Sequence, residues 1–153
     1  SEIVFPSESI PAVLAHQRVE SDNSSGRSPH RLENFMQYML TFYTVPQSPT
    51  APVDPAARQA YLGAWRAYMG AMQGAGVMVN GHGLQPPHTA TTLRVTNGKR
   101  VVQDGPFADS KEQLGGYFVI DVATLDDALE WAARSPAAAE GAVEVRPVLA
   151  PPG

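Results

Sequence analysis

A short polar stretch between two strand-like runs most constrains how this chain can fold. It begins with Asp104-Gly105-Pro106-Phe107 and continues through residues 108–117, and it brings turn-forming residues, charged residues and glycines together. Asp bonds nearby backbone amides in turns, Gly adopts backbone angles that other residues avoid, and Pro fixes its own angle. The stretch therefore indicates either a specialised turn or a site, and the apolar runs beside it are expected to be strands.

The runs on either side of this stretch support that expectation. Residues 91–96 and 99–103 read as strands, and the Asn97-Gly98 dipeptide between them is typical of a two-residue hairpin turn. Residues 117–122 are strongly apolar and predict another strand, after which Thr124 caps a helix. The apolar stripe predicted for this helix consists of Leu125, Ala128, Leu129 and Ala132.

The first half of the folded region shows a strand followed by a long helix. In residues 36–43, Tyr38, Leu40 and Phe42 share one face at period two. Asp54-Pro55 is a favourable helix start, and Gly74 and Gly76 end that helix. Between them an apolar stripe recurs at helical spacing: Tyr61, Leu62, Trp65, Tyr68, Met69 and Met72. Residues 77–80 and 143–148 predict two further strands, the last of which carries Pro147 and best fits a sheet edge.

The predicted order of elements is strand, helix, strand, hairpin, strand, helix, strand. This order indicates an α+β fold, ferredoxin-like βαββαβ with an inserted β-hairpin. Helices on one face of a single sheet leave the other face uncovered. If Tyr38 and its neighbours face the helices, the uncovered face presents Met39, Thr41 and Tyr43.

The 104–107 motif and its continuation resemble the signature of the DGPF-domain family, a branch of the YCII-related proteins. The resemblance covers residues 36–147. It implies that two copies pair their sheets into a dimeric α+β barrel with a cleft in each subunit, so we expect a homodimer. We assign residues 36–149 to a YCII-related (DGPF) domain and residues 1–35 to a linker-like N-terminal extension, because residues 21–29 are polar and turn-rich.

Composition excludes several classes of function. At 153 residues the chain fits one domain with a substantial core. Its net charge is −4 and it has no run of Lys and Arg, so we expect no direct binding to nucleic acid. The absence of Cys excludes disulfides and a thiolate nucleophile. Its apolar runs are far shorter than the ~20 residues of a membrane helix, and we expect a cytoplasmic protein without membrane contact.

Asp104 and His82 are the candidate catalytic residues. Asp104 is either a structural turn residue, with Phe107 plugging the core, or a carboxylate aimed into a cleft as a general acid or base. His82 lies among glycines that would let the backbone turn sharply and hold an imidazole over the cleft, beside Asp104. The parent YCII-related group is associated with a helical His and an Asp, but residues 61–66 contain no His, so that pair is not carried over.

Five further residues are candidates for ligand binding. Lys111 and Glu112 are either a solvated pair or, with Gly115-Gly116 allowing close backbone approach, a site for an anionic or polar ligand. Tyr43 and Phe107 are expected in the same cleft, and Arg94 is an alternative to Lys111 for holding an anionic group. The available His and carboxylate spacings match no recognised ligand pattern, so we expect no metal, and we expect no cofactor.

Three hypotheses for function follow. The leading one is a protein that binds a small polar or aromatic molecule in a cleft near the 104–107 motif. The second is an enzyme that catalyses proton transfer or elimination on a carbonyl or lactone substrate, with Asp104 or His82 as the base. The third, implied by the family resemblance, is a regulatory partner of an extracytoplasmic-function sigma factor.

Overall fold

A computed structural model describes residues 35–47 and 53–152 of the chain. The N-terminal extension expected over residues 1–35 lies, except for Phe35, outside the described residues. The described elements are, in chain order, β1 (Met36–Thr44), α1 (Pro55–Gly74), β2 (Met78–Gly83), β3 (Thr91–Thr96), β4 (Lys99–Asp104), β5 (Gln113–Val122), α2 (Leu125–Ala133) and β6 (Ala142–Pro147). Two short 3₁₀ turns, η1 (Pro87–Thr89) and η2 (Pro136–Ala139), precede β3 and β6.

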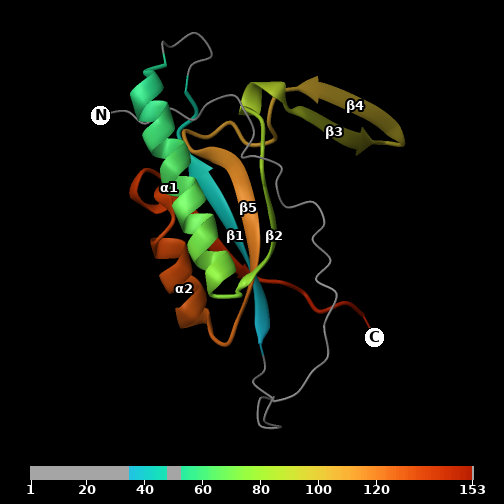
Figure 1. Cartoon of the computed structure of the whole chain (residues 1–153). Helices are drawn as coiled ribbons and strands as arrows, with labels where there is room; N and C mark the ends of the chain where they lie inside the picture. The colour runs from blue at the N-terminus through green and yellow to red at the C-terminus, as the bar shows by residue number, and fades with distance from the viewer. Residues whose placement is uncertain (1–34, 48–52, 153) are drawn as a thin grey trace, which may run out of the picture.

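The main sheet has the strand order β2-β5-β1-β6, with every neighbouring pair antiparallel. This is the ferredoxin-like arrangement predicted from the order of the elements, so the predicted fold class is confirmed. Within the described part of the chain, strands β3 and β4 pair only with each other, and they form the inserted hairpin. Figure 1 shows α1 and α2 against one face of the sheet, with the hairpin projecting away from the body at one end. β6 lies at a sheet edge, as the proline at its end predicted.

Local sequence signals explain where the helices begin. The Asp54 side chain accepts a hydrogen bond from the Ala56 N–H at 3.1 Å, and Pro55 occupies the first helical position of α1. The Thr124 hydroxyl likewise accepts from the Asp127 N–H at 3.1 Å at the start of α2. Both caps satisfy backbone donors that would otherwise lack a partner in the first turn.

Aromatic rings form the centre of the core between α1 and the sheet. The rings of Phe42 and Trp65 meet edge to face with centroids 5.1 Å apart, and Phe118 lies 5.4 Å from Phe42 in the same manner. The Tyr68 hydroxyl donates to the Trp131 carbonyl at 2.8 Å and so links α1 to α2. The predicted stripe of α1 is confirmed, since Tyr61, Trp65, Tyr68 and Met72 are buried.

The predicted stripe of α2 was too wide. Ala128 and Ala132 are buried against the sheet, whereas Leu125 and Leu129 are 48% and 47% exposed. Successive helical residues are turned by about 100°, so Leu129 points away from the sheet that its neighbour Ala128 contacts. The fully buried residues of this helix are therefore two small alanines, and the partly buried Trp131 packs against the same core.

The glycines around His82 serve a different purpose from the one predicted. His82 lies in strand β2 rather than in a loop, and Gly115 and Gly116 lie in β5. A Cβ on Gly81 would lie 1.8 Å from Cδ1 of Phe118, and one on Gly116 would lie 2.8 Å from the His82 carbonyl oxygen. These glycines therefore allow close packing between β2 and β5, and the prediction of a sharply turned loop was wrong.

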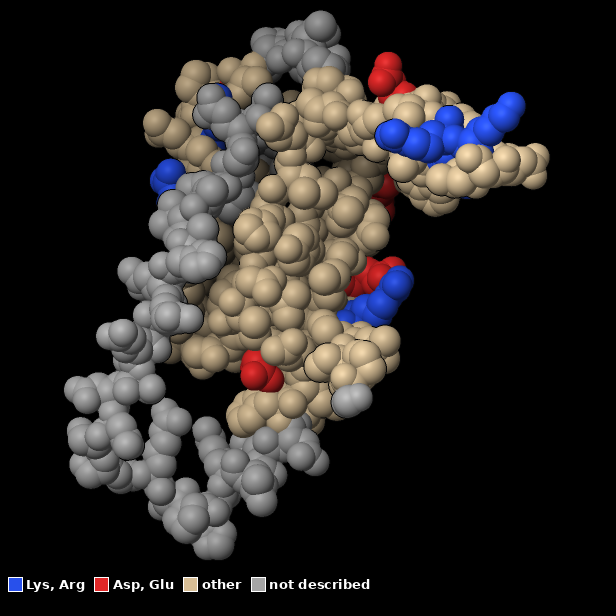
Figure 2. All heavy atoms as spheres, turned by 90° about the vertical axis from the view of Figure 1, so that its right-hand side faces the viewer, with Lys and Arg blue, Asp and Glu red and all other residues tan. Residues whose placement is uncertain are grey.

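The second face of the main sheet carries no helix among the described residues. As predicted, Met39, Thr41 and Tyr43 lie on this face and are half-buried, opposite the buried set Tyr38, Leu40 and Phe42. Figure 2 views the molecule from the side toward which the hairpin projects. The middle of this surface is largely uncharged, and a group of acidic and basic side chains lies at its edge below the hairpin. No helix in the described part of the chain is long and apolar enough to cross a lipid bilayer.

Candidate functional site

A cavity of about 760 Å³ lies between the base of the hairpin and the adjacent end of the main sheet. We call it the motif cavity, because Pro106 and Phe107 of the 104–107 motif line it. Most of its lining is apolar: Tyr43, Leu84, Pro86, Pro87, Ala90, Leu93, Pro106, Phe107, Ala108 and Leu114. Its polar lining consists of Gln85, Thr89, Thr91, Thr92, Ser110, Glu112 and Gln113. Cavities of this size and composition bind small molecules in many proteins.

Gly105 fixes the path of the chain beside this cavity. Its φ of +103° lies in a region that residues with a side chain rarely adopt. Its N–H donates to the Ala90 carbonyl at 2.8 Å, and its own carbonyl accepts from the Thr92 hydroxyl at 2.8 Å. These bonds hold the motif against the start of β3 and so place Pro106 and Phe107 at the cavity.

Three of the residues proposed from the sequence line the motif cavity, namely Tyr43, Phe107 and Glu112. A fourth, Arg94, does not line it, but its guanidinium lies over the Phe107 ring at 5.0 Å from the centroid. Phe107 is 75% exposed, so the reading of this residue as a core plug was wrong. The motif turns the ring out of the protein body, where Arg94 covers one part of it.

Asp104, His82 and Lys111 lie outside the lining of the motif cavity. Asp104 ends β4 opposite Thr91 and is exposed, and its carboxylate has no hydrogen bond to any residue that the structure describes. His82 sits on the helix-free face of the sheet, where its ring lies 5.8 Å from that of Tyr117. Among the described residues no contact joins His82 to Asp104, so their pairing stays a prediction.

Sequence reasoning missed Gln113, which lines the cavity at the start of β5. Its Nε2 donates to the Ser110 carbonyl at 3.3 Å, whereas its Oε1 is shielded from solvent and has no partner among the described residues. Pro86 and Pro87 were also passed over as lining residues, although two adjacent prolines beside Leu84 are a signal for a rigid apolar wall.

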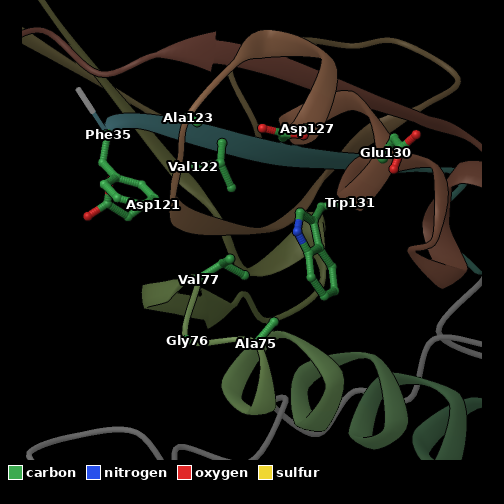
Figure 3. A pocket seen from close by; sticks show the side chains of 10 residues that line it. All are labelled: Phe35, Ala75, Gly76, Val77, Asp121, Val122, Ala123, Asp127, Glu130 and Trp131. Carbon is green, nitrogen blue, oxygen red and sulfur yellow. The ribbon is translucent and has the colours of Figure 1, made fainter. Parts of the chain in front are cut away.

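A smaller cavity of about 410 Å³ lies at the far end of the sheet, where α1 ends and α2 begins. Figure 3 shows the Trp131 side chain extending from α2 toward the end of α1 near Ala75, with Val77 to one side and Asp127 and Glu130 along α2. Asp127 is in the first turn of α2, where a carboxylate is favoured by the helix dipole. The described residues include no group of three or more His, Cys, Asp or Glu side chains that could share a metal ion.

Comparison with known proteins places these features in a family context. A family model described as the YCII-related domain matches residues 36–150. A protein of Rhizobium meliloti (strain 1021), described as uncharacterized, is 48% identical over 67 residues. That alignment covers 42% of this chain and 54% of the relative, so the chain spans about half the length of the relative it matches.

Proposed function

The chain belongs to the YCII-related domain family, and from that premise we propose that it binds a small polar or aromatic molecule in the motif cavity. The observation that carries this proposal is the cavity itself. Its volume of about 760 Å³ falls within the roughly 300–1,000 Å³ of small-molecule sites, and its walls combine apolar residues with a few polar groups. Tyr43 and Phe107 offer aromatic surface for a ring or an alkyl group.

The first test is ligand screening by NMR with a filled-cavity variant. We expect a mixture of small aromatic and polar compounds to shift the amide signals of Tyr43, Thr92 and Leu114, which line or border the cavity. Leu114→Trp adds bulk to the lining and is expected to abolish these shifts. Leu129→Trp is the matched control, because Leu129 is an exposed leucine on α2 that does not line the cavity.

The proposal fails if compounds bind elsewhere, or if both tryptophan variants reduce binding equally. Equal reduction would mean that the loss comes from a general effect of the added ring on folding rather than from a filled cavity. Circular dichroism spectra of both variants, recorded together with the screen, distinguish a loss of folded structure from a blocked binding site.

The hypothesis of proton transfer or elimination stays a prediction. A general base must lie within hydrogen-bonding reach of the proton that it removes. Asp104 and His82 line neither of the two cavities described above. The sigma-factor hypothesis also stays a prediction, since it derives from the family resemblance and no contact among the described residues bears on it.

A further inference from the structure

Three of the five side-chain hydroxyl groups that line the motif cavity have already used their hydrogens. Thr89 Oγ1 donates to the Pro86 carbonyl at 2.7 Å and Thr92 Oγ1 donates to the Gly105 carbonyl at 2.8 Å. Ser110 Oγ donates to the Glu112 carbonyl. A hydroxyl has one hydrogen to donate and two lone pairs. Toward a ligand, these three side chains can therefore act only as acceptors.

Much of the nearby backbone is also unable to donate. Pro86, Pro87 and Pro106 have no N–H. The N–H groups of Thr89 and Ala90 are bonded to the carbonyls of Pro86 and Pro87 at 2.9 and 3.0 Å. A ligand that needs several donors from this part of the cavity would leave its own acceptors unpaired, which is unfavourable in a partly buried site.

The side chain of Gln113 holds an unpartnered acceptor beside the cavity. Its Nε2 faces the Ser110 carbonyl, and because a carbonyl only accepts hydrogen bonds, this contact fixes which end of the amide is the oxygen. The Oε1 atom is shielded from solvent and lacks a partner among the described residues. Because Oε1 has no surface open to solvent, a donor on a bound molecule reaches it only once the Gln113 side chain turns toward the cavity. The new bond would then recover the free energy that an unpartnered buried acceptor costs.

The charge of the lining also favours a ligand that donates hydrogen bonds and carries positive charge. Glu112 is a cavity-lining carboxylate, and no Lys, Arg or His is found among the lining residues that the structure describes. Arg94 lies over the Phe107 ring outside the lining. Tyr43, Gln85 and Thr91 retain donors, so a neutral acceptor on the ligand can still be met. The lining offers no positive charge to an anion.

Building on the function proposed above, we propose that the ligand of the motif cavity is an amine with an apolar body. Its amino group, protonated at neutral pH, donates a hydrogen bond to the Glu112 carboxylate and, once the Gln113 side chain turns toward the cavity, a second one to Gln113 Oε1. Its apolar body contacts the proline wall and Phe107. This assignment differs from the anionic ligand expected from Lys111 and Arg94, because neither of those side chains lines the cavity.

Three probes of matched shape test the ligand class: 2-phenylethylamine, 2-phenylethanol and phenylacetate. Binding to the full chain is measured by NMR titration, with the amide signals of Thr92 and Leu114 reporting on the cavity. We expect the amine to bind at least about tenfold more tightly than the carboxylate, the scale of one charge-assisted hydrogen bond. The alcohol is expected to fall between them.

Two variants test the residues. Glu112→Gln removes the charge and is expected to weaken amine binding several-fold while leaving the alcohol nearly unchanged. Gln113→Met keeps the length of the side chain but removes the acceptor, so it is expected to weaken the amine and the alcohol alike. Asp109→Asn is the matched control for lost charge, because Asp109 is an exposed carboxylate three residues from Glu112 that does not line the cavity.

The outcomes distinguish failure of the amine assignment from failure of the proposed binding site. If phenylacetate binds at the cavity as well as the amine, or if Asp109→Asn weakens the amine as much as Glu112→Gln does, the amine assignment is overturned while the binding site stands. If no probe shifts the cavity signals and the broader screen is also silent, the proposed function fails and the amine assignment fails with it.

Discussion

At the scale of single residues, Gly105 rather than Asp104 stabilises the motif turn. Gly105 has a φ of +103°, donates its N–H to the Ala90 carbonyl and accepts from the Thr92 hydroxyl, whereas the Asp104 carboxylate makes no hydrogen bond to the described residues. We expect Gly105→Ala to lower the free energy of unfolding by on the order of 1 kcal/mol, because alanine is strained at this φ. Asp104→Ala is expected to change it by less than about 0.5 kcal/mol, as for other exposed substitutions.

Urea denaturation of the two variants, with the amide signals of Thr92 and Phe107 as local reporters, checks this prediction. Asp109→Ala serves as the control for removal of an exposed carboxylate in the same loop. A loss of stability in Asp104→Ala equal to that in Gly105→Ala would show that the carboxylate holds the turn, as a structural role for the aspartate requires.

The residues of the candidate site were only partly predictable, because the direction of a side chain depends on strand register. The ladder between β2 and β5 shifts register between Met78 and Asn80, and beyond that shift His82 lies opposite Tyr117. A shift of one residue transfers a side chain to the other face of a sheet, and no pattern in the sequence marks this irregularity. Tyr43 and Phe107 could be placed beside the cavity because Tyr43 lies near the end of a strand and Phe107 lies in a turn motif, and both settings constrain the position of the side chain.

At the scale of elements, two buried tyrosines of α1, one of which is hydrogen-bonded to α2, predict a change in stability at alkaline pH. Burial raises the pKa of Tyr61 and Tyr68 well above their ordinary value. The unfolded chain then releases these protons at about pH 10, where the folded protein still holds them. The stability that the neutral phenols contribute is complete below about pH 10 and is lost as the pH rises further.

The substitution Tyr68→Phe removes the titrating hydroxyl of Tyr68 and keeps its aromatic ring. It removes the hydrogen bond to the Trp131 carbonyl, so at pH 8 we expect a loss of about 1 kcal/mol in the free energy of unfolding. Between pH 10 and 11 its stability is expected to fall less steeply than that of the natural chain, since one titrating phenol is gone. Urea denaturation at these pH values gives both quantities, with Tyr43→Phe as a control outside the core. Equal slopes would contradict the prediction.

Element boundaries could be predicted wherever a local signal fixes them. The Asn97-Gly98 turn, with φ values of +51° and +73°, connects β3 and β4 as expected, and the caps at Asp54 and Thr124 begin the helices. The start of β5 was placed too late, because Gly115 and Gly116 resemble loop residues in isolation. They belong to the strand because β5 pairs with β1 and β2 there. β2 approaches too closely for a side chain at Gly116, which is a tertiary effect.

At the scale of the whole molecule, the helix-free face of the sheet is the surface on which we propose that a second copy packs. Met39 lies opposite Val119 in β5 and opposite Arg146 in β6, near the middle of this face. Val119 is 7% exposed, and Met39 and Tyr117 beside it are half-buried, so the centre of the face is apolar. The exposed Glu144–Arg146 ion pair lies on β6, at the sheet edge, and contributes little by itself. An apolar centre with a charged rim is the usual composition of a protein interface.

Sedimentation equilibrium should therefore give a molar mass twice that of the chain. Met39→Lys places a cation beside Arg146 in the apolar centre of the proposed interface, where burying the charge would oppose packing, so we expect this variant to sediment as a monomer. Leu129→Lys makes a matched change from an apolar residue to lysine at an exposed site on α2, and we expect it to remain a dimer. A dimer that survives Met39→Lys but dissociates with Leu129→Lys would move the interface to the helices. A monomeric natural chain would show that the sheet face is stable in water on its own, as antiparallel sheets with one solvated face can be.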